Sequence, residues 1–353
     1  MKEAGDICVI SIPFAAGVLL ASFIKPGPLF ASASLWLAVS VLVLFVSRRG
    51  RCEAYAALLF FLLGNFCYSS DALRGSILPG EGLTDRFIPA LNGYIGSLPF
   101  KRDDTVSIIS ALLSGDRSGI DRNVVKAFRE SGAAHILALS GLHLGVIYLI
   151  ISKPLSLLGN SRTAVTVRSI STIAICGTYT ILTGASPSLF RAFFFIVLNE
   201  ISTHCSGRRH SPVSTLCTVL TLQLIINPQA IETLSFQLSY LAVAGIVLIY
   251  PLIDGIYPYG HRLNPFRKIW SSVALSTSCQ ITTAPLVWMR FHSLPRYFIL
   301  TNLIALPLSE AVLVCAVVTM LLHVLFPGFS VGARICDKLV EWLVFSLKTI
   351  SSM

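Results

Sequence analysis

The chain has 353 residues, of which 54% are hydrophobic and only 12% are charged. Soluble domains usually carry about 25% charged residues, so this sequence cannot cover a globule of its size with a water-compatible surface. The composition excludes a soluble enzyme and a disordered chain, and it predicts a polytopic membrane protein. The net charge of +10 is then more typical of basic cytoplasmic loops than of nucleic-acid binding.

Motifs that carry catalysis or hold a cofactor are not found. The sequence has no P-loop, G-x-G-x-x-G, H-E-x-x-H or G-x-S-x-G motif, and its nine cysteines show no metal-ligand spacing. We therefore expect no enzyme activity, no cofactor and no bound metal. The first apolar run is followed directly by a second one, so we expect a membrane helix at the N-terminus rather than a cleaved signal peptide.

The first 134 residues divide into two predicted regions. Residues 1–68 are predicted to form N-terminal transmembrane helices, on the apolar runs 7–24, 29–46 and 54–68. Residues 69–134 hold Gly, Pro and charges instead. They predict an extracytoplasmic segment with amphipathic helices, one of them near residues 83–98.

Residues 135–353 are predicted to form the membrane core. Their apolar runs lie at 136–152, 163–182, 189–203, 213–226, 234–253, 269–289 and 297–326. As one helix the last run would be about 45 Å long, against a hydrocarbon core of about 30 Å, and Pro307 interrupts it. We expect a broken or steeply tilted helix there. The predicted fold class is all-α, a polytopic transmembrane bundle of about ten spans.

The last segment, residues 331–350, combines apolar residues with one charged stripe. The stripe consists of Arg334, Asp337, Lys338, Glu341 and Lys348. At helical spacing these residues cover one side, which favours an amphipathic helix at the membrane interface over a span that lines a pore.

The orientation follows from three basic clusters in short loops, Arg48–Arg51, Arg208–Arg209 and Arg262–Lys268. Cytoplasmic loops carry the excess of Lys and Arg, so these clusters are placed inside. The N-terminus is then cytoplasmic and residues 69–134 lie outside.

Three helix starts share one pattern, in which a capping side chain precedes a proline. They are Ser186-Pro187, Ser211-Pro212 and Asn227-Pro228. Ser and Asn accept hydrogen bonds from the first free N–H groups of a helix, and proline fits the first helical position.

Polar groups at membrane depth are costly, so each is a candidate site, although each could also simply hold two helices together. At helical spacing, His135, Ser140 and His143 share one side of the helix predicted for this block. Gly141 and Gly145 lie on another side, where a neighbouring backbone could approach. This pattern predicts a polar, water-facing stripe, and the two-turn spacing of the histidines does not favour a metal chelate.

Arg191 lies just over one turn beyond Ser186. A guanidinium beside a helix N-terminus attracts phosphate, and the alternative is an Arg that reaches to lipid headgroups.

Other polar positions are Gln237, Ser239 and Tyr240, then the stripe Ser272, Ser276, Gln280 and Thr283, and finally Glu310, which follows Asn302 and Pro307. Each stripe either lines water or packs closely against another helix.

Several ordered blocks of sequence carry a resemblance to a known family. They are G-D-R-S-G at 115–119, F-R-E-S-G-A-A-H-I-L-A-L-S-G-L-H-L-G at 128–145, T-G-A-S-P-S-L-F-R-A at 183–192, N-P-Q-A-I-E-T-L-S-F-Q-L-S-Y-L-A-V-A-G-I at 227–246, Q-I-T-T-A-P-L at 280–286 and N-L-I-A-L-P-L at 302–308. In these blocks the chain resembles the integral-membrane domain of the ComEC family of competence proteins.

The resemblance implies a channel that passes single-stranded DNA through the bacterial inner membrane during natural transformation. The polar residues on the family blocks would line the DNA path: His135, Ser140, His143, Ser188, Arg191, Gln237, Ser239, Gln280 and Asn302. Asp116 and Arg117 would lie at its outer entrance.

The resemblance also implies partners. Besides single-stranded DNA and membrane lipids, these are an external DNA receptor, a separate nuclease and a cytoplasmic DNA-translocating ATPase. Family members commonly carry an external OB-like domain and a C-terminal metallo-β-lactamase-like domain. Residues 69–134 are too few for the full external part, and the sequence has no H-x-H-x-D-H motif. We therefore expect any strand-degrading activity to come from another chain or to be absent.

Two other functions compete with the channel. The first is a secondary transporter of a small or lipid-linked solute, with Glu310 as a proton site and Pro307 breaking a helix at the substrate. The second is a non-transporting remnant of the family.

Overall fold

The computed structural model describes residues 2–25, 28–47, 53–74, 81–159, 161–205, 211–257, 265–292, 294–326 and 330–352. Within these residues the chain forms helices and no strand, which confirms the all-α prediction. The basic residues Arg48, Arg49, Arg51, Arg208, Arg209 and Arg262, on which the predicted orientation depends, lie outside the described residues.

The helices follow the predicted apolar runs closely. They are α1 (Lys2–Ile24), α2 (Pro28–Ser47), α3 (Glu53–Arg74), α4 (Glu81–Ser97), α5 (Asp103–Ser114), α6 (Arg122–Glu130), α7 (Gly141–Leu155), η1 (Ser156–Leu158), α8 (Arg162–Leu182), α9 (Pro187–Cys205), α10 (Pro212–Ile226), η2 (Pro228–Glu232), α11 (Leu234–Leu248), α12 (Tyr250–Asp254), α13 (Pro265–Phe291), α14 (Phe298–Leu325) and α15 (Val331–Ser351). Each of the three predicted caps is found. Ser186, Ser211 and Asn227 accept from the backbone N–H of Leu189, Ser214 and Ala230 respectively.

One prediction about helix boundaries is wrong, and the structure refines two others. The run from His135 is not one helix, because residues 131–140 form turns and α7 begins only at Gly141. Residues 234–253 divide into α11 and α12, with Pro251 in the first turn of α12. Conversely, α14 continues through Pro307 as one helix of 28 residues. At 1.5 Å per residue this helix is about 42 Å long. The expected break at Pro307 is therefore not found, and a steep tilt in the membrane stays a prediction.

Four segments of the described chain are long and apolar enough to cross a membrane. They are Ile7–Ile24, Arg162–Leu182, Leu234–Asp254 and Phe298–Leu325. Shorter apolar helices lie at Phe30–Leu42, Gly141–Leu155 and Pro212–Ile226. A total of about ten spans stays a prediction.

The chain divides into two compact units. Unit 1 comprises Met1–Pro79 and Phe194–Val243, and unit 2 comprises Gly80–Phe193 and Ala244–Met353. In unit 1, α1 crosses α3 at two glycines. A Cβ on Gly17 would lie 2.0 Å from the carbonyl oxygen of Phe61, and one on Gly64 would lie 2.2 Å from that of Phe14. Only glycine permits backbones to approach this closely.

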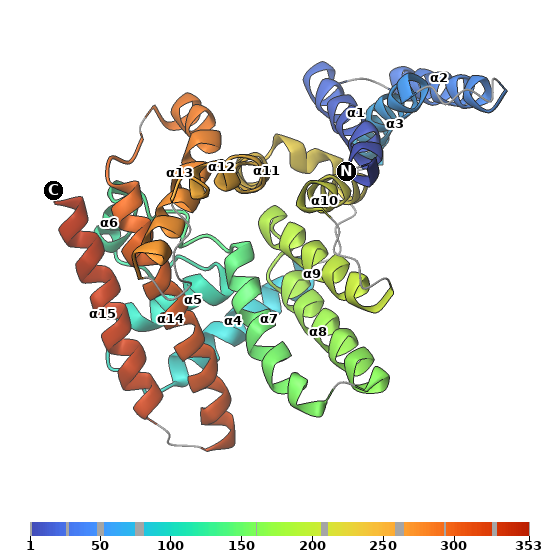
Figure 1. Cartoon of the computed structure of the whole chain (residues 1–353). Coiled ribbons are helices and arrows are strands. Elements are labelled where there is room, and N and C mark those ends of the chain that lie inside the picture. Colours follow the sequence, from blue (N-terminus) through green and yellow to red (C-terminus); the bar gives the residue numbers. More distant parts are fainter. Residues whose placement is uncertain are drawn as a thin grey trace. The chain divides into compact units, whose positions relative to one another are not determined.

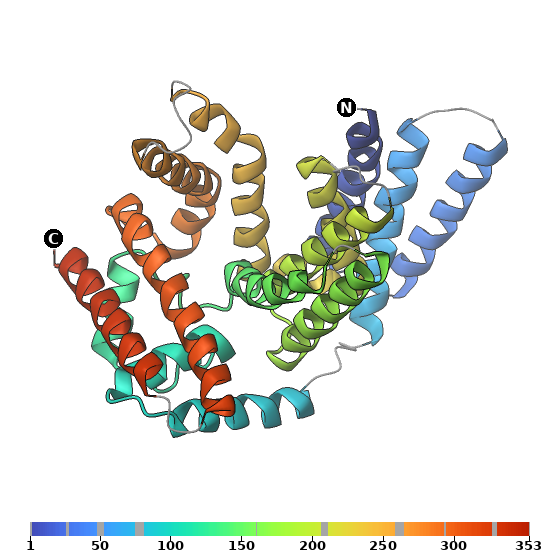
Figure 2. The same ribbon diagram turned by 60° about the horizontal axis from the view of Figure 1, so that its bottom comes forward.

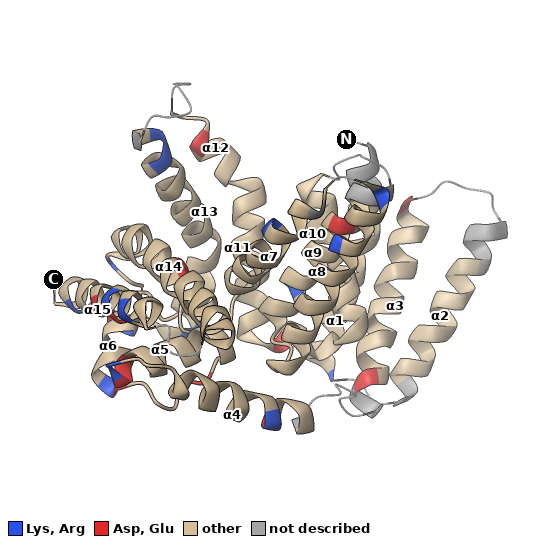
Figure 3. Ribbon diagram, turned by 90° about the horizontal axis from the view of Figure 1, so that it is seen from below, with Lys and Arg blue, Asp and Glu red and all other residues tan. Residues whose placement is uncertain are grey.

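Helices α1, α3 and α10 of unit 1 begin on the same side. Figure 3 shows α1 and α3 both starting at the upper end of this unit. The sulfur atoms of Cys8 and Cys217 lie 3.5 Å apart, which places the early turns of α1 and α10 together. Because α1 and α3 are parallel, the chain must reverse in α2 between them, as the predicted topology requires.

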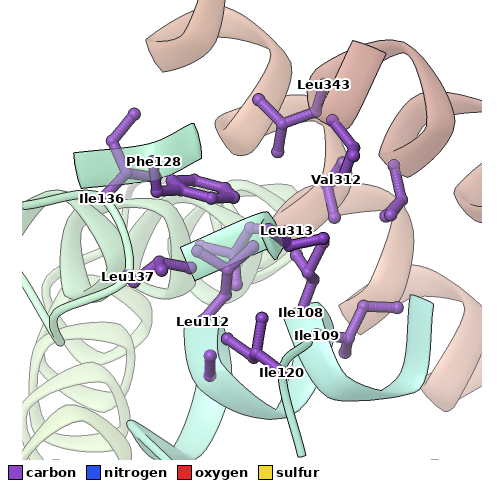
Figure 4. Close-up of a cluster of buried hydrophobic side chains, with 14 of the residues drawn as sticks. Ile108, Ile109, Leu112, Ile120, Phe128, Ile136, Leu137, Val312, Leu313 and Leu343 are labelled. Carbon is purple, nitrogen blue, oxygen red and sulfur yellow. The ribbon is translucent and has the colours of Figure 1, made fainter. Parts of the chain in front are cut away.

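Unit 2 contains a hydrophobic core shared by helices that are distant in sequence (Figure 4). Its buried side chains include Ile108 and Leu112 of α5, Phe128 of α6, Val312 and Leu313 of α14, and Leu343 of α15. Helices α14 and α15 form an antiparallel hairpin in this core (Figure 1).

Two hydrogen bonds join the segment 94–131 to α14, one near each end of this helix. The Tyr94 hydroxyl donates to the carbonyl oxygen of Met320 (2.9 Å), and the Thr301 hydroxyl donates to that of Ser131 (2.7 Å). Figure 2 shows α4, in cyan, running across the loop end of the α14–α15 hairpin. Residues 81–134 therefore belong to the same core as α14 and α15.

The charged stripe of α15 takes part in this packing. Asp337 is buried and accepts from the backbone N–H of Lys101 (3.0 Å), and Glu341 pairs with Arg102 (3.1 Å). Arg334 and Lys338 are exposed. The stripe thus serves in part to dock the loop before α5, and an interfacial position of α15 stays a prediction.

Candidate functional site

The start of α7 is the first place where the predicted polar residues meet. Ser140 is the N-cap and forms a capping box with His143. The Nδ1 atom of His143 accepts from the backbone N–H of Ser140 at 3.4 Å, and the His143 side chain is only 3% exposed. His143 therefore helps to begin a helix as well as supplying polarity, and a Ser with a polar residue three positions later is a sequence signal for such a start.

The first turn of α7 packs on the first turns of α9. A Cβ on Gly141 would lie 3.0 Å from the Ala192 Cβ, 3.7 Å from Arg191 Nη2 and 3.7 Å from the carbonyl oxygen of Ser188. The predicted approach of a neighbouring helix is thus confirmed at Gly141, and it is wrong at Gly145, where nothing lies within 4 Å. Two of the family-like blocks therefore come together at this junction.

The electrostatics of the α7–α9 junction favour an anion. Arg191 is only 8% exposed and its guanidinium adjoins the N-terminus of α7. Arg191 also lies near the N-terminus of its own helix, which starts at Pro187. Helix N-termini carry partial positive charge and free N–H groups, so a guanidinium beside the start of α7 attracts phosphate.

The G-D-R-S-G loop after α5 is a turn held in place by hydrogen bonds. Gly115 ends α5 with a positive φ of 79°. The Asp116 carboxylate accepts from the backbone N–H of Ser118 (2.9 Å) and from the Asn92 amide of α4 (2.8 Å). These hydrogen bonds, the one from Ser118 first, hold the pKa of Asp116 below its usual value. Asp116 therefore attaches α4 to the loop. This structural role was not predicted from the sequence, which placed Asp116 only at the outer entrance.

Arg117 and His135 are both attached to the turns between α6 and α7. Arg117 is exposed and its Nε donates to the carbonyl oxygen of Leu137 (2.9 Å). His135 is exposed and its Nδ1 lies 3.0 Å from the carbonyl oxygen of Gly132. His135 is not on the helix of Ser140 and His143, so the common helical stripe proposed for the three is wrong in its geometry.

Gln237 and Ser239 lie on α11 within unit 1 and are half-buried. The Gln237 amide donates to the carbonyl oxygen of Ile231 (2.8 Å), so part of its hydrogen-bonding capacity closes the turn before α11. The neighbouring Tyr240 hydroxyl donates to the side chain of Gln223 (2.8 Å), which is only 2% exposed. Gln223 was not predicted from the sequence, because a single glutamine in an apolar run gives no periodic signal.

Gln280 and Asn302 lie in unit 2 on α13 and α14. Both are half-buried, and the buried Oδ1 of Asn302 accepts no hydrogen bond from the described residues. Gly245 of α11 packs closely on Ser278 and Thr282 of α13, which lie on a different side from Gln280. The stripe with Gln280 is therefore not the surface that α11 contacts through this glycine.

A polar pair in unit 1 was also missed. The Tyr68 hydroxyl of α3 donates to the Glu232 carboxylate, which follows the Asn227-Pro228 cap. The two residues are far apart in sequence, so only the fold shows that they meet. Among the described residues no group of three or more His, Cys, Asp or Glu side chains could hold a metal ion.

Comparison with known proteins places this chain among competence proteins. Residues 112–353 match the family described as Competence protein. ComE operon protein 3 of Bacillus subtilis is 25% identical over 246 residues, covering 68% of this chain and 30% of the relative. Recombination protein 2 of Haemophilus influenzae is 25% identical over 243 residues, covering 66% and 30%.

The uncharacterized protein YcaI of Escherichia coli is 24% identical over 286 residues, covering 79% of this chain and 37% of the relative. The chain therefore spans 30–37% of the length of these relatives. No solved structure matches it.

Proposed function

The chain belongs to the Competence protein family, and from this premise we propose that it forms a channel for single-stranded transforming DNA in the bacterial inner membrane. The family match and the apolar helices support a membrane protein of DNA uptake. The single observation that carries the channel is the α7–α9 junction. There a buried guanidinium and two helix N-termini form a positive site on residues of two family-like blocks.

The proposed path uses the residues named from the sequence: His135, Ser140, His143, Ser188, Arg191, Gln237, Ser239, Gln280 and Asn302. Asp116 and Arg117 remain the proposed outer entrance. The proposed partners are membrane lipids, an external DNA receptor, a separate nuclease and a cytoplasmic ATPase. The last of these would supply the energy, since the sequence contains no P-loop.

We test conduction with the full chain in vesicles of zwitterionic lipid that contain a trapped nuclease inhibitor. A diffusion potential, positive inside, drives a labelled single-stranded oligonucleotide inward. Nuclease added outside then removes what has not entered. We expect protected single strands and no protected duplex, because the proposed channel passes single-stranded DNA. Equal protection in protein-free vesicles would contradict the channel. Uptake of a small solute without DNA, abolished in Glu310→Gln, would favour the transporter instead.

The proposed topology has its own test, cysteine labelling in intact cells of a cysteine-free background. We expect Ser118→Cys, in the exposed loop after α5, to react with an impermeant maleimide from outside. We expect Lys268→Cys, near the start of α13, to react only after permeabilisation. The parallel start of α1, α3 and α10 supports this orientation, since two of these helices follow basic loops. The reverse labelling pattern would invert the topology.

A further inference from the structure

The turns between α6 and α7 have an inner and an outer side. Ile136 and Leu137 are each only 3% exposed and point into the core of unit 2 (Figure 4). Ala134 and His135 are exposed. The segment is fixed at its beginning as well, because Gly132 has a φ of 86° and a Cβ there would lie 2.5 Å from the Cβ of Pro295. Residues 131–140 are therefore anchored to the core of unit 2, while His135 lies on the exposed side of this segment.

One nitrogen of the Arg117 side chain, Nε, is hydrogen-bonded to residues 131–140. Its Nε donates to the carbonyl oxygen of Leu137, two residues from His135. Its loop is fixed in turn by the hydrogen bonds of Asp116 to Ser118 and Asn92. The two terminal Nη groups of Arg117 form no hydrogen bond or ion pair with the described residues, and the side chain is exposed. Arg117 thus presents a pre-oriented pair of N–H donors, the geometry that binds a phosphate through two parallel hydrogen bonds.

The hydrogen bond of His135 fixes its tautomer. A carbonyl oxygen can only accept, so the Nδ1 atom beside the Gly132 oxygen carries the proton. His135 is exposed, and its Nε2 atom forms no hydrogen bond with the described residues. A neutral imidazole can accept from a base amino group and can stack on a base, but it adds no charge.

We propose that Arg117 and His135 together form a binding site for one nucleotide of single-stranded DNA, with Arg117 on the phosphate and His135 on the base. This inference rests on the function proposed above and deepens it, because it names the residues that first distinguish a single strand. Positive charge alone binds duplex and single strand alike, whereas a ring stacks only on a base that is unpaired. Asp116 is a positioning residue in this site, because its oxygens accept hydrogen bonds from Ser118 of the loop and from Asn92 of α4.

The test is equilibrium binding of labelled oligo-dT to the full chain in nanodiscs of zwitterionic lipid, over a series of salt concentrations. Arg117→Ala should weaken binding and reduce the slope of log affinity against log salt by about 0.7, the value of one single-strand phosphate. Arg117→Lys should restore most of the slope, because it keeps the charge. The matched control is Arg122→Ala, which removes an exposed Arg at the start of α6 and should leave affinity and slope unchanged.

Variants of His135 test the base contact. His135→Ala should weaken single-strand binding about fivefold or more without changing the salt slope, and His135→Phe should restore it, because a phenyl ring also stacks. Duplex DNA of the same length should be bound equally well by these variants and by the original chain. If Arg117→Ala and Arg122→Ala reduce the slope equally, or if His135→Ala binds single strands normally, the site is refuted. If the original chain binds no DNA, the proposed function itself fails.

Discussion

Gly17→Ala should leave little folded protein. A Cβ at this position would lie 2.0 Å from the carbonyl oxygen of Phe61 and 3.1 Å from the backbone nitrogen of Asn65. Both atoms belong to the backbone of α3, so no side chain can move aside, and α1 and α3 would have to separate. Overpacking a core usually costs about 1–3 kcal/mol, and a clash with backbone on both sides of a helix crossing should cost more than about 3 kcal/mol.

The measurement is the free energy of unfolding in mixed micelles, with the recovery of monodisperse protein as a second readout. The matched control is Gly145→Ala in α7, where nothing lies within 4 Å of the added Cβ. There alanine should be neutral or stabilising by about 0.5–1 kcal/mol, because glycine is the poorer helix former. If both variants are equally stable, the close crossing of α1 and α3 is wrong.

Arg191→Met should lower DNA uptake by about tenfold or more at equal expression. Methionine keeps much of the apolar stem of this buried side chain, so the variant removes mainly the charge beside the N-termini of α7 and α9. Hydrogen bonds to charged groups contribute about 1.5–3 kcal/mol, which corresponds to about 10- to 150-fold. Arg191→Lys should recover part of the uptake, because it keeps the charge but loses the planar fork.

The readout is transformation frequency in a competent strain that lacks its own family member and expresses this chain. Arg162→Ala serves as the control, since Arg162 is an exposed Arg at the start of α8. Thermal unfolding of each purified variant separates loss of folding from loss of uptake. Normal uptake by a folded Arg191→Met variant would mean that Arg191 has a packing role only, and the proposed path would lose its principal charged residue.

The sequence by itself determined the fold class and most helix limits. Apolar runs of about 20 residues can satisfy their backbone hydrogen bonds in a membrane only as helices, so hydropathy alone predicts them. The caps at Ser186, Ser211 and Asn227 were equally predictable, because a capping side chain and a proline act on their own helix. The start of α7 was misplaced, although the Ser140–His143 pair was visible in the sequence as a local signal.

The tertiary structure alone decided which polar residues meet. Arg117 reaches the carbonyl oxygen of Leu137, and Arg191 lies against Gly141, because packing between helices brings segments together that no periodicity connects. It also decided that Asp337 holds the loop before α5 and that Asp116 holds α4. A charge in the sequence shows only that a partner must exist, since leaving a buried charge unpaired is costly. The identity of that partner depends on distances between backbones, which are set by the packing of the whole core.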